Sequence, residues 1–325
     1  MTVVAPPDVS VVIVVKDDPR VLDCVEAVLA QSAPFSAEVV VAVDDDPTDD
    51  TPDLLADAFG DEDRVRVLET TGNVAEAWNA GARAARADVI ARIDSDAVPL
   101  DGWLAAIAHP VLDGEVEWSA GSVEGVHTEG LVARYFHHRT EAYCRRFEDE
   151  RNLRDEVPSW NVAYDRATLE EAGWYDPWLR ASEDWDLHKR LADLGARGIY
   201  VPGARIRHHH PETMGTFARK EAWYKTGQYQ MMLKHGPATV AEALVLPAAY
   251  AGVLAVLAAG VLVPAMAGAG LGLLLLVAAW HAVGGLREDD PAWYLRPLFR
   301  PIEALAGLYG LARGLLVYGF TRPSG

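Results

Sequence analysis

The chain has 325 residues, of which half are hydrophobic, and its formal net charge at pH 7 is −19. This acidity argues against a nucleic-acid partner, because binding to a phosphate backbone needs a basic surface. The whole excess of negative charge lies in residues 1–236, which hold 43 acidic and 24 basic side chains. Only five of the 29 basic residues are lysines. An acidic surface that is poor in lysine favours adaptation to high salt over an ordinary acidic protein.

The first hundred residues alternate between strand-like and helix-like segments. β-branched or alternating runs predict strands over residues 9–15, 37–43, 64–70 and 88–94, with 64–70 as an edge strand. Helical spacing and start signals predict helices over residues 20–31, from Thr51-Pro52 onwards, and over 74–87. This order predicts an α/β domain with a mostly parallel sheet and helices on both faces.

Two long apolar segments follow residue 236. Residues 240–263 contain one charge, Glu242, and residues 265–285 contain none, so each is long enough to cross a bilayer as a helix, with Pro264 at the turn. The alternative is a buried helical hairpin of a soluble domain. A third segment, residues 302–320, carries Glu303 and Arg313 and would either span or lie in the membrane interface.

These segments divide the chain into two predicted domains. Residues 1–236 would be a catalytic domain and residues 237–325 a membrane region. The start, MTVVAPPDVS, lacks the basic region and apolar core of a signal peptide, so we expect the catalytic domain in the cytoplasm. Cys24 and Cys144 form no C-x-x-C motif, and we expect two buried thiols in a reducing compartment.

Paired carboxylates follow two of the predicted strands. Asp44-Asp45-Asp46 comes after the second strand and Asp94-Ser95-Asp96 after the fourth, whereas Asp61 and Asp63 lie in a loop before a strand, as ordinary surface acids. Ligands of such sheets bind beyond the carboxyl ends of the strands. Because no G-x-G-x-x-G or Walker motif is present to hold phosphates, the acids favour a metal–nucleotide site with Mg²⁺ or Mn²⁺.

Four stretches carry a resemblance to a known family. In order they read VSVVIVVKDD, EVVVAVDDDPTDDT, NAGARAARADVIARIDSDAVPLDGWL and NVAYDRATLEEAGWYDPWLRASEDWDLHKRLADLGARGIYVPGARIRHHH, over roughly residues 9–210. The ordered set resembles family 2 glycosyltransferases of the GT-A fold. That resemblance implies sugar transfer from a nucleotide-diphosphate donor, usually with inversion and with a divalent metal.

The resemblance also implies roles for particular residues. Asp44 would contact the nucleoside, Asp94 the nucleotide sugar and Asp96 the metal. Asp184 would be the general base, and His208 a metal ligand, although the run His208–His210 offers three choices. Independently of the resemblance, we expect one of four tryptophans to stack on sugar or acceptor and the others to serve packing: Trp160, Trp174, Trp178 and Trp185.

Some residues invite another interpretation or depart from the family pattern. Asp184 could instead belong to a helix start capped by Ser182, and Asp186 is expected to be structural. Val15-Lys16-Asp17 and Trp78 stand where the family often has Pro-Tyr-Asn and Arg, which leaves the donor nucleotide open.

The membrane segments point to a lipid-linked acceptor. The Gln-x-x-Arg-Trp motif of processive family members is missing from residues 220–236, which favours a single transfer. The chain is thus similar to haloarchaeal Agl-type enzymes that build dolichol-phosphate-linked N-glycans for surface-layer proteins, and we expect a multi-pass protein of the cell membrane. A catalytically silent membrane scaffold and a nucleotidyltransferase are the alternatives.

Overall fold

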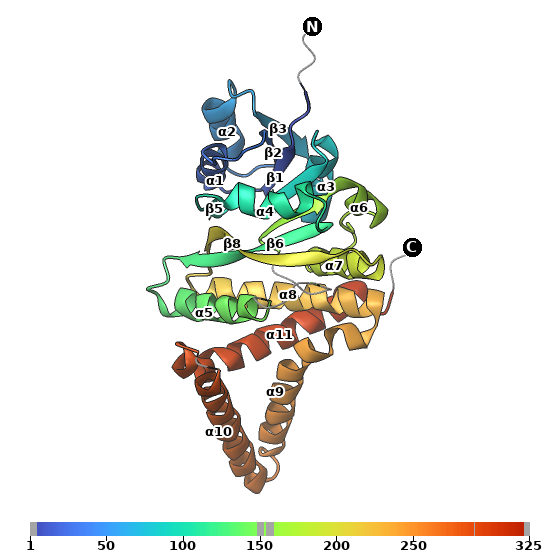
Figure 1. Ribbon diagram of the computed structural model, residues 1–325. Coiled ribbons are helices and arrows are strands. Elements are labelled where there is room, and N and C mark those ends of the chain that lie inside the picture. The colour runs from blue at the N-terminus through green and yellow to red at the C-terminus, as the bar shows by residue number, and fades with distance from the viewer. Residues whose placement is uncertain (1–4, 148–152, 154–158, 289, 322–325) are drawn as a thin grey trace. The chain divides into compact units, whose positions relative to one another are not determined.

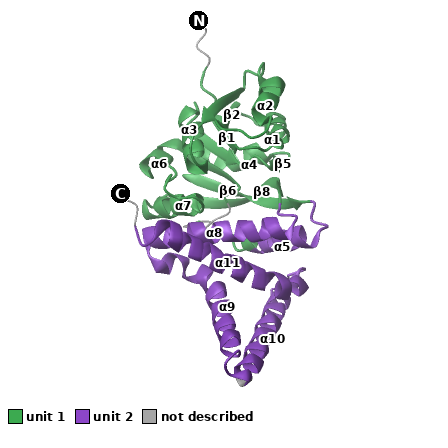
Figure 2. Cartoon of the chain, turned by 180° about the vertical axis from the view of Figure 1, so that it is seen from behind, with its two compact units in different colours: residues 1–126, 143–209 green, residues 127–142, 210–325 purple. Residues whose placement is uncertain are grey.

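The computed structural model describes residues 5–147, 153, 159–288 and 290–321 (Figure 1). The chain forms two compact units, distinguished by colour in Figure 2. Unit 1 comprises residues 1–126 and 143–209, and unit 2 comprises residues 127–142 and 210–325. Residues 210–236 thus pack with the C-terminal helices, while the functional boundary at residue 236 stays a prediction.

Unit 1 contains an eight-stranded sheet. Its strands are β1 (Val9–Val15), β2 (Ala37–Asp44), β3 (Val65–Thr70), β4 (Val89–Ile93), β5 (Ala97–Pro99), β6 (Trp118–Val126), β7 (Asn161–Asp165) and β8 (Gly198–His209). Their order is β3-β2-β1-β4-β7-β6-β8-β5, so β3 lies at an edge as predicted.

The sheet is mixed rather than mostly parallel. Strands β1 to β4 pair in parallel, as the alternation of strands and helices predicted. Strand β7 then runs antiparallel to both β4 and β6, β5 runs antiparallel to β8, and β6 and β8 are parallel. The prediction of a mostly parallel sheet is therefore correct for the first half of the sheet only.

The helices of unit 1 connect these strands. They are α1 (Val21–Leu29), α2 (Thr51–Phe59), α3 (Val74–Ala84), α4 (Trp103–Leu112), α6 (Arg166–Glu171) and α7 (Glu183–Asp193). Helix α3 starts at Asn73, whose side chain and that of Glu76 form a capping box. It lies against β1 at Gly81, where an added Cβ would stand 2.6 Å from Val12 Cγ1. The β-branched strands β1 and β2 fill the core beneath it, with most of their side chains buried.

Unit 2 is helical. Its elements are most of α5 (Leu131–Arg145), α8 (Met214–His235), the 3₁₀ helix η1 (Pro237–Val240), α9 (Ala241–Ala259), α10 (Pro264–Arg287), the 3₁₀ helix η2 (Trp293–Leu295) and α11 (Arg296–Tyr318). Aromatic residues of α5, α8 and α11 form its core, where the ring of Tyr135 stacks on Phe299 at 4.3 Å and Phe217 packs edge-on against both.

Helix α11 approaches α8 through a face of glycines. Gly307, Gly310 and Gly314 recur at helical spacing, and a Cβ at Gly310 would lie 2.3 Å from the carbonyl oxygen of Ala222. A Cβ at Gly314 would lie 2.7 Å from the ring of Tyr229. Larger residues at these positions would therefore separate the two helices.

A buried ionic cluster also holds α11. Glu303 accepts hydrogen bonds from Tyr135 at 2.9 Å, Arg139 at 2.7 Å and Arg300 at 2.8 Å. Arg139 also donates to Glu221 on α8 at 2.6 Å. Burial opposes ionisation of Glu303, but the two arginines hold its pKa below the ordinary value. The charge of Glu303 is thus compensated within the protein.

Among the described residues, two helices are long and apolar enough to cross a membrane. They are Pro237–Ala259 and Met266–Arg287, with mean hydropathies of 2.0 and 1.8. Only 22% and 11% of their most apolar windows are buried within the protein, and residues such as Leu262, Leu276 and Trp280 are exposed. This exposure counts against the alternative of a buried hairpin, whose apolar side chains would be covered by protein.

Candidate active site

Two strands bring the Asp94–Asp96 segment beside His208. Strand β4 ends at Ile93, the two aspartates follow, and the chain then enters β5, which pairs antiparallel with the end of β8. The register sets Ala97 opposite His208. As a result, His208 Nε2 lies 3.3 Å from Asp94 Oδ2 and 3.2 Å from Asp96 Oδ1.

The tautomer of His208 suits a metal ligand. Its Nδ1 lies 2.7 Å from the carbonyl oxygen of His209, which can only accept, so Nδ1 carries a proton. In the neutral ring Nε2 then presents its lone pair to two carboxylates. One ligand atom from each of His208, Asp94 and Asp96 lies within 4.8 Å of the others. A cation among the three would relieve this concentration of acceptors.

Among the described residues, the group of ligand atoms at the aspartates includes neither of the other two histidines of the run. His209 follows on β8, where consecutive side chains point to opposite faces of the sheet. His210 belongs to unit 2, where its ring packs against Phe136 at 5.0 Å. Of the three, His208 is the one that the structure places with the aspartates.

Two arginines also reach the paired aspartates. Arg20 Nη2 lies 3.7 Å from Asp96 Oδ2, and Arg92 Nη2 lies 3.7 Å from both Asp94 Oδ1 and Glu183 Oε1. Arg92 is buried between aromatic rings, 4.4 Å above Trp78 and 5.3 Å from Tyr175. It thereby joins the aspartate pair to the start of α7.

Asp184 lies in the first turn of α7 and contacts the same region. Its Oδ2 accepts a hydrogen bond from Ser159 Oγ, and its Oδ1 accepts one from the backbone of Trp185 at 2.8 Å. The neighbouring Trp160 carbonyl accepts from the Asp94 amide at 3.2 Å, so the segment before β7 links Asp184 to the aspartate pair.

The capping alternative for this helix start is not what the structure shows. Ser182 occupies the N-cap position with a left-handed backbone (φ 62°), and its side chain makes no capping hydrogen bond. Asp186 behaves as the structural residue we expected, since it is fully buried and pairs with Arg190 at 2.7 Å. Of the other two acids in this turn, Glu183 is buried beside Arg92, whereas Asp184 is partly exposed.

Glu183 and Arg92 were not among the predicted site residues. Burial, and then the charge of Asp184, raises the pKa of Glu183 to about 7, while Arg92 acts in the opposite direction. Glu183 could have been found from its place beside Asp184. Arg92 could not, because nothing in an apolar strand indicates that one of its side chains turns toward a site.

Asp44 ends β2 at the same edge of the parallel strands. It pairs with Lys16 at 3.0 Å, and it accepts from the Asp46 backbone at 3.0 Å. Asp17 accepts from both the amide and the hydroxyl of Thr48, at 2.6 and 2.8 Å. Lys16 and Asp17, which depart from the family pattern, therefore hold the loop that follows β2.

The other departure, Trp78, is a packing residue. It is buried beneath Arg92, and the adjacent Asn79 exchanges two hydrogen bonds with the backbone of Tyr175. Of the four tryptophans proposed for stacking, Trp160 packs edge-on against Tyr143 and Trp174 lies under Arg83. All four remain partly exposed, and stacking on a sugar stays a prediction.

His188 of α7 ends a chain of buried polar groups behind the site. Arg92 donates to the Tyr175 hydroxyl at 3.0 Å. The Tyr175 hydroxyl lies 3.3 Å from the Tyr164 hydroxyl, which in turn lies 2.9 Å from His188 Nε2. The His188 ring stacks on Trp118 at 4.6 Å. Burial lowers the pKa of His188 to about 4, although Asp184 acts in the opposite direction.

His188 should make the protein sensitive to acid. The pKa of His188 is about 4 in the folded protein and 6.5 in the unfolded chain. The contribution of the neutral ring to the free energy of unfolding is therefore complete above pH 6.5 and is lost as the pH falls toward 4. The loss should be on the order of 3 kcal/mol. In urea unfolding at pH 7 and 4.5, His188→Gln should lose less stability between the two pH values than the wild type. Tyr164→Phe, which keeps the buried imidazole, should retain the wild-type difference; equal losses in wild type and His188→Gln would refute the assignment.

The part of the chain that carries Asp94 and Asp96 is similar to a known family. Residues 10–162 match glycosyl transferase family 2. Apart from Val9, the match covers the first three of the four stretches whose motifs resemble this family, and the start of the fourth.

Two relatives share parts of the sequence. The chain is 28% identical over 165 residues to pre-mycofactocin glycosyltransferase of Mycobacterium tuberculosis (strain CDC 1551 / Oshkosh). The aligned stretch covers 50% of this chain but 35% of that relative. The chain is also 25% identical over 232 residues to glycosyltransferase AglE of Haloferax volcanii, and this aligned stretch covers 70% of this chain and 75% of AglE. The chain thus aligns with about a third of the first relative and three quarters of the second.

A solved structure shares the fold. The mannosyltransferase PcManGT from Pyrobaculum calidifontis, in complex with GDP-Man and Mn²⁺, aligns with 94% of this chain and 88% of its own. The TM-score is 0.65 and the sequence identity 20%. The sheet described above is accordingly GT-A-like.

Proposed function

We propose that this protein is a metal-dependent glycosyltransferase that transfers one sugar from a nucleotide-diphosphate donor. The observation that carries the proposal is the meeting of Asp94, Asp96 and His208 within 4.8 Å, at the end of β4 in a family 2 domain. A site at this edge of an α/β sheet is where a nucleotide would bind.

The three side chains fit a divalent cation. Two carboxylates and one imidazole suit Mn²⁺ or Mg²⁺, and the protonated Nδ1 of His208 leaves Nε2 as the ligand atom. The structurally similar PcManGT was solved with GDP-Man and Mn²⁺, which supports this choice. Such an ion, when bound, neutralises charge on the departing diphosphate.

Asp184 is proposed as the general base. The acceptor hydroxyl gives its proton to the Asp184 carboxylate as the hydroxyl oxygen forms a bond to the anomeric carbon, and the bond from that carbon to the diphosphate breaks on the opposite side. This displacement inverts the anomeric centre. The hydrogen bonds from Ser159 and the Trp185 amide orient the carboxylate, since each donates to one of its oxygens. Asp44 is proposed to contact the nucleoside.

The product identifies the reaction class. The purified chain should be incubated with Mn²⁺, nucleotide sugars and lipid-linked acceptors, and the nucleotide product analysed. We expect a nucleoside diphosphate to be released. Pyrophosphate as product would indicate a nucleotidyltransferase instead, and no product with any donor would favour the catalytically silent scaffold.

The helices of unit 2 support a membrane-bound enzyme. We propose that α9 and α10 span the bilayer and that α11 lies at its interface, because the glycine face of α11 packs on α8 while Leu305, Tyr309, Leu316 and Phe320 are exposed. An enzyme held in this way meets a lipid-linked acceptor. The similarity to AglE and the acidic composition support a role in surface-layer N-glycosylation in a halophile, with Mg²⁺ or Mn²⁺ as cofactor.

The spanning helices predict a definite topology. With the catalytic domain in the cytoplasm, α9 would run outward and α10 would return, so Leu262 in their connection would face the outside. In a background without Cys24 and Cys144, Leu262→Cys should react with a membrane-impermeant thiol reagent in intact cells. Ser324→Cys, outside the described residues, should react only after lysis. Labelling of Ser324→Cys in intact cells would mean that the third segment spans, and no labelling of Leu262→Cys would contradict the hairpin.

A further inference from the structure

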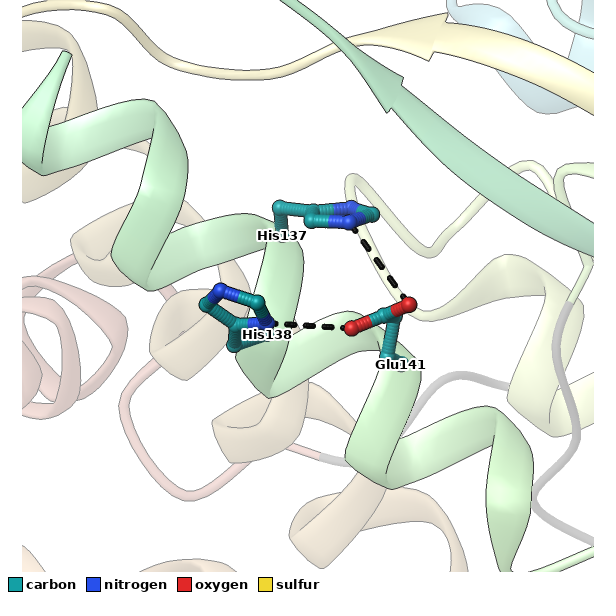
Figure 3. Close-up of side chains that lie close together, drawn as sticks. All are labelled: His137, His138 and Glu141. Carbon is teal, nitrogen blue, oxygen red and sulfur yellow. Dashed lines mark hydrogen bonds and ion pairs between the residues drawn. The ribbon is translucent and has the colours of Figure 1, made fainter. Parts of the chain in front are cut away.

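Helix α5 carries a second group of metal-ligating side chains. His137, His138 and Glu141 lie close together, with both imidazole rings directed toward the carboxylate (Figure 3). His137 Nε2 lies 3.6 Å from Glu141 Oε1, and His138 Nδ1 lies 3.0 Å from Oε2. Glu141 follows the histidines by four and three residues, so one helical turn brings its carboxylate beside both rings.

The spacing of these atoms matches that of ligands around a small cation. Tetrahedral zinc ligands lie about 2.0–2.1 Å from the ion and hence about 3.3 Å from one another. The two measured separations, 3.0 and 3.6 Å, lie on either side of that value, and one ligand atom from each residue is within 4.8 Å of the others. The group therefore needs little rearrangement to receive an ion.

The donor atoms favour a different metal from that of the aspartate pair. Two imidazoles and one carboxylate suit Zn²⁺, whereas two carboxylates and one imidazole suit Mn²⁺ or Mg²⁺. The side chains are 18%, 20% and 40% exposed, so an ion can reach them from solvent. Three protein ligands would leave a fourth position to water or to another side chain.

The surroundings within unit 2 are compatible with a cation. The nearest arginine along the helix, Arg139, pairs with Glu221 and Glu303, so its charge is compensated. The ring of His210 lies 5.8 Å from that of His137, which places a third imidazole at the border of the group.

We propose that His137, His138 and Glu141 form a Zn²⁺ site on α5. This site shares no residue with the proposed catalytic centre and does not depend on the proposed function.

Spectroscopy of the whole protein in detergent can test the site, with Co²⁺ as the probe because it takes the same ligands and absorbs visible light. We expect the wild type to bind Co²⁺ with the absorption of a four-coordinate ion, and Zn²⁺ to displace it. His138→Gln and Glu141→Gln should each weaken binding about tenfold or more, since even the loss of an outer-shell partner costs 10–100-fold. Circular dichroism should show that both variants remain folded.

Matched variants separate this site from other ligands. His235→Gln makes the same change at another histidine of unit 2 and should leave the Co²⁺ spectrum and affinity unchanged. Asp96→Ala, which removes a ligand of the proposed catalytic metal, should also retain the spectrum. The proposal would be overturned if the wild type gave no four-coordinate spectrum, or if His138→Gln and Glu141→Gln bound Co²⁺ as tightly as the wild type.

Discussion

Asp96→Ala is expected to lower sugar transfer about 10³-fold or more while leaving the protein folded. Asp96 offers one of three ligand atoms, 3.2 Å from His208 Nε2, and it is partly exposed rather than part of the core. Stabilisation of the departing diphosphate by a metal is worth several kcal/mol, which corresponds to a loss of this size. Initial rates with saturating donor and Mn²⁺ would measure it.

Asp61→Ala is the matched control for this variant. Asp61 also belongs to a pair of aspartates one residue apart, but it is exposed before β3, so its removal should leave the rate near that of the wild type. A chelator should reduce the wild-type rate to that of Asp96→Ala. Wild-type activity in Asp96→Ala, or in the presence of chelator, would show that the metal assignment is wrong.

Asp184→Asn is expected to lower turnover by about 10²–10⁴-fold, the usual cost of losing a general base. The asparagine oxygen can still accept from the Trp185 amide, and its NH₂ group can donate to the Ser159 hydroxyl, so the local structure should survive. Because the base acts on the acceptor, the affinity for donor nucleotide should change little. Steady-state rates and a donor titration on the same preparation would separate the two effects.

Asp186→Asn should show the opposite behaviour. Asp186 is buried in an ion pair with Arg190, and loss of its charge leaves a guanidinium with less compensation, so the melting temperature should fall while turnover is largely kept. If Asp184→Asn instead turned over normally and melted at a lower temperature, Asp184 would be a structural residue and another base would be needed.

The first half of the sheet could be predicted because its pattern is local. The runs at Val9–Val15 and Ala37–Asp44 are β-branched and bounded by turn residues, and the helices between them show clear spacing. The antiparallel partners β7 and β5 depend on contacts between distant segments, such as Ala97 with His208, which no local pattern reveals. The mixed sheet was therefore missed.

In the candidate site, too, local patterns could be predicted and contacts between distant segments could not. Asp94 and Asp96 were found from their place at a strand end, but the choice among three consecutive histidines needed the register of β8 against β5. Arg92 and Glu183 were missed because they meet through a buried contact of 3.7 Å between segments 91 residues apart.

In unit 2, the roles of several α11 residues depend on partners that the sequence of the helix does not reveal. From the sequence, Glu303 and Arg313 were interpreted only as charges that leave residues 302–320 either spanning the membrane or lying at its interface. In the structure Gly310 and Gly314 admit the backbone and a ring of α8, and Glu303 is paired with Arg139 and Arg300. Sequence composition could not indicate these partners, because they belong to other helices.

The central claim is that Asp94, Asp96 and His208 hold a metal that in turn holds a nucleoside diphosphate, and calorimetric titration tests it most directly. UDP and GDP should each be titrated into wild type and Asp96→Ala, with Mn²⁺ and with chelator. We predict that at least one nucleotide binds the wild type with Mn²⁺, and that this binding is lost with chelator and in Asp96→Ala. Binding that is equally tight with chelator, or in Asp96→Ala with Mn²⁺, would contradict the account.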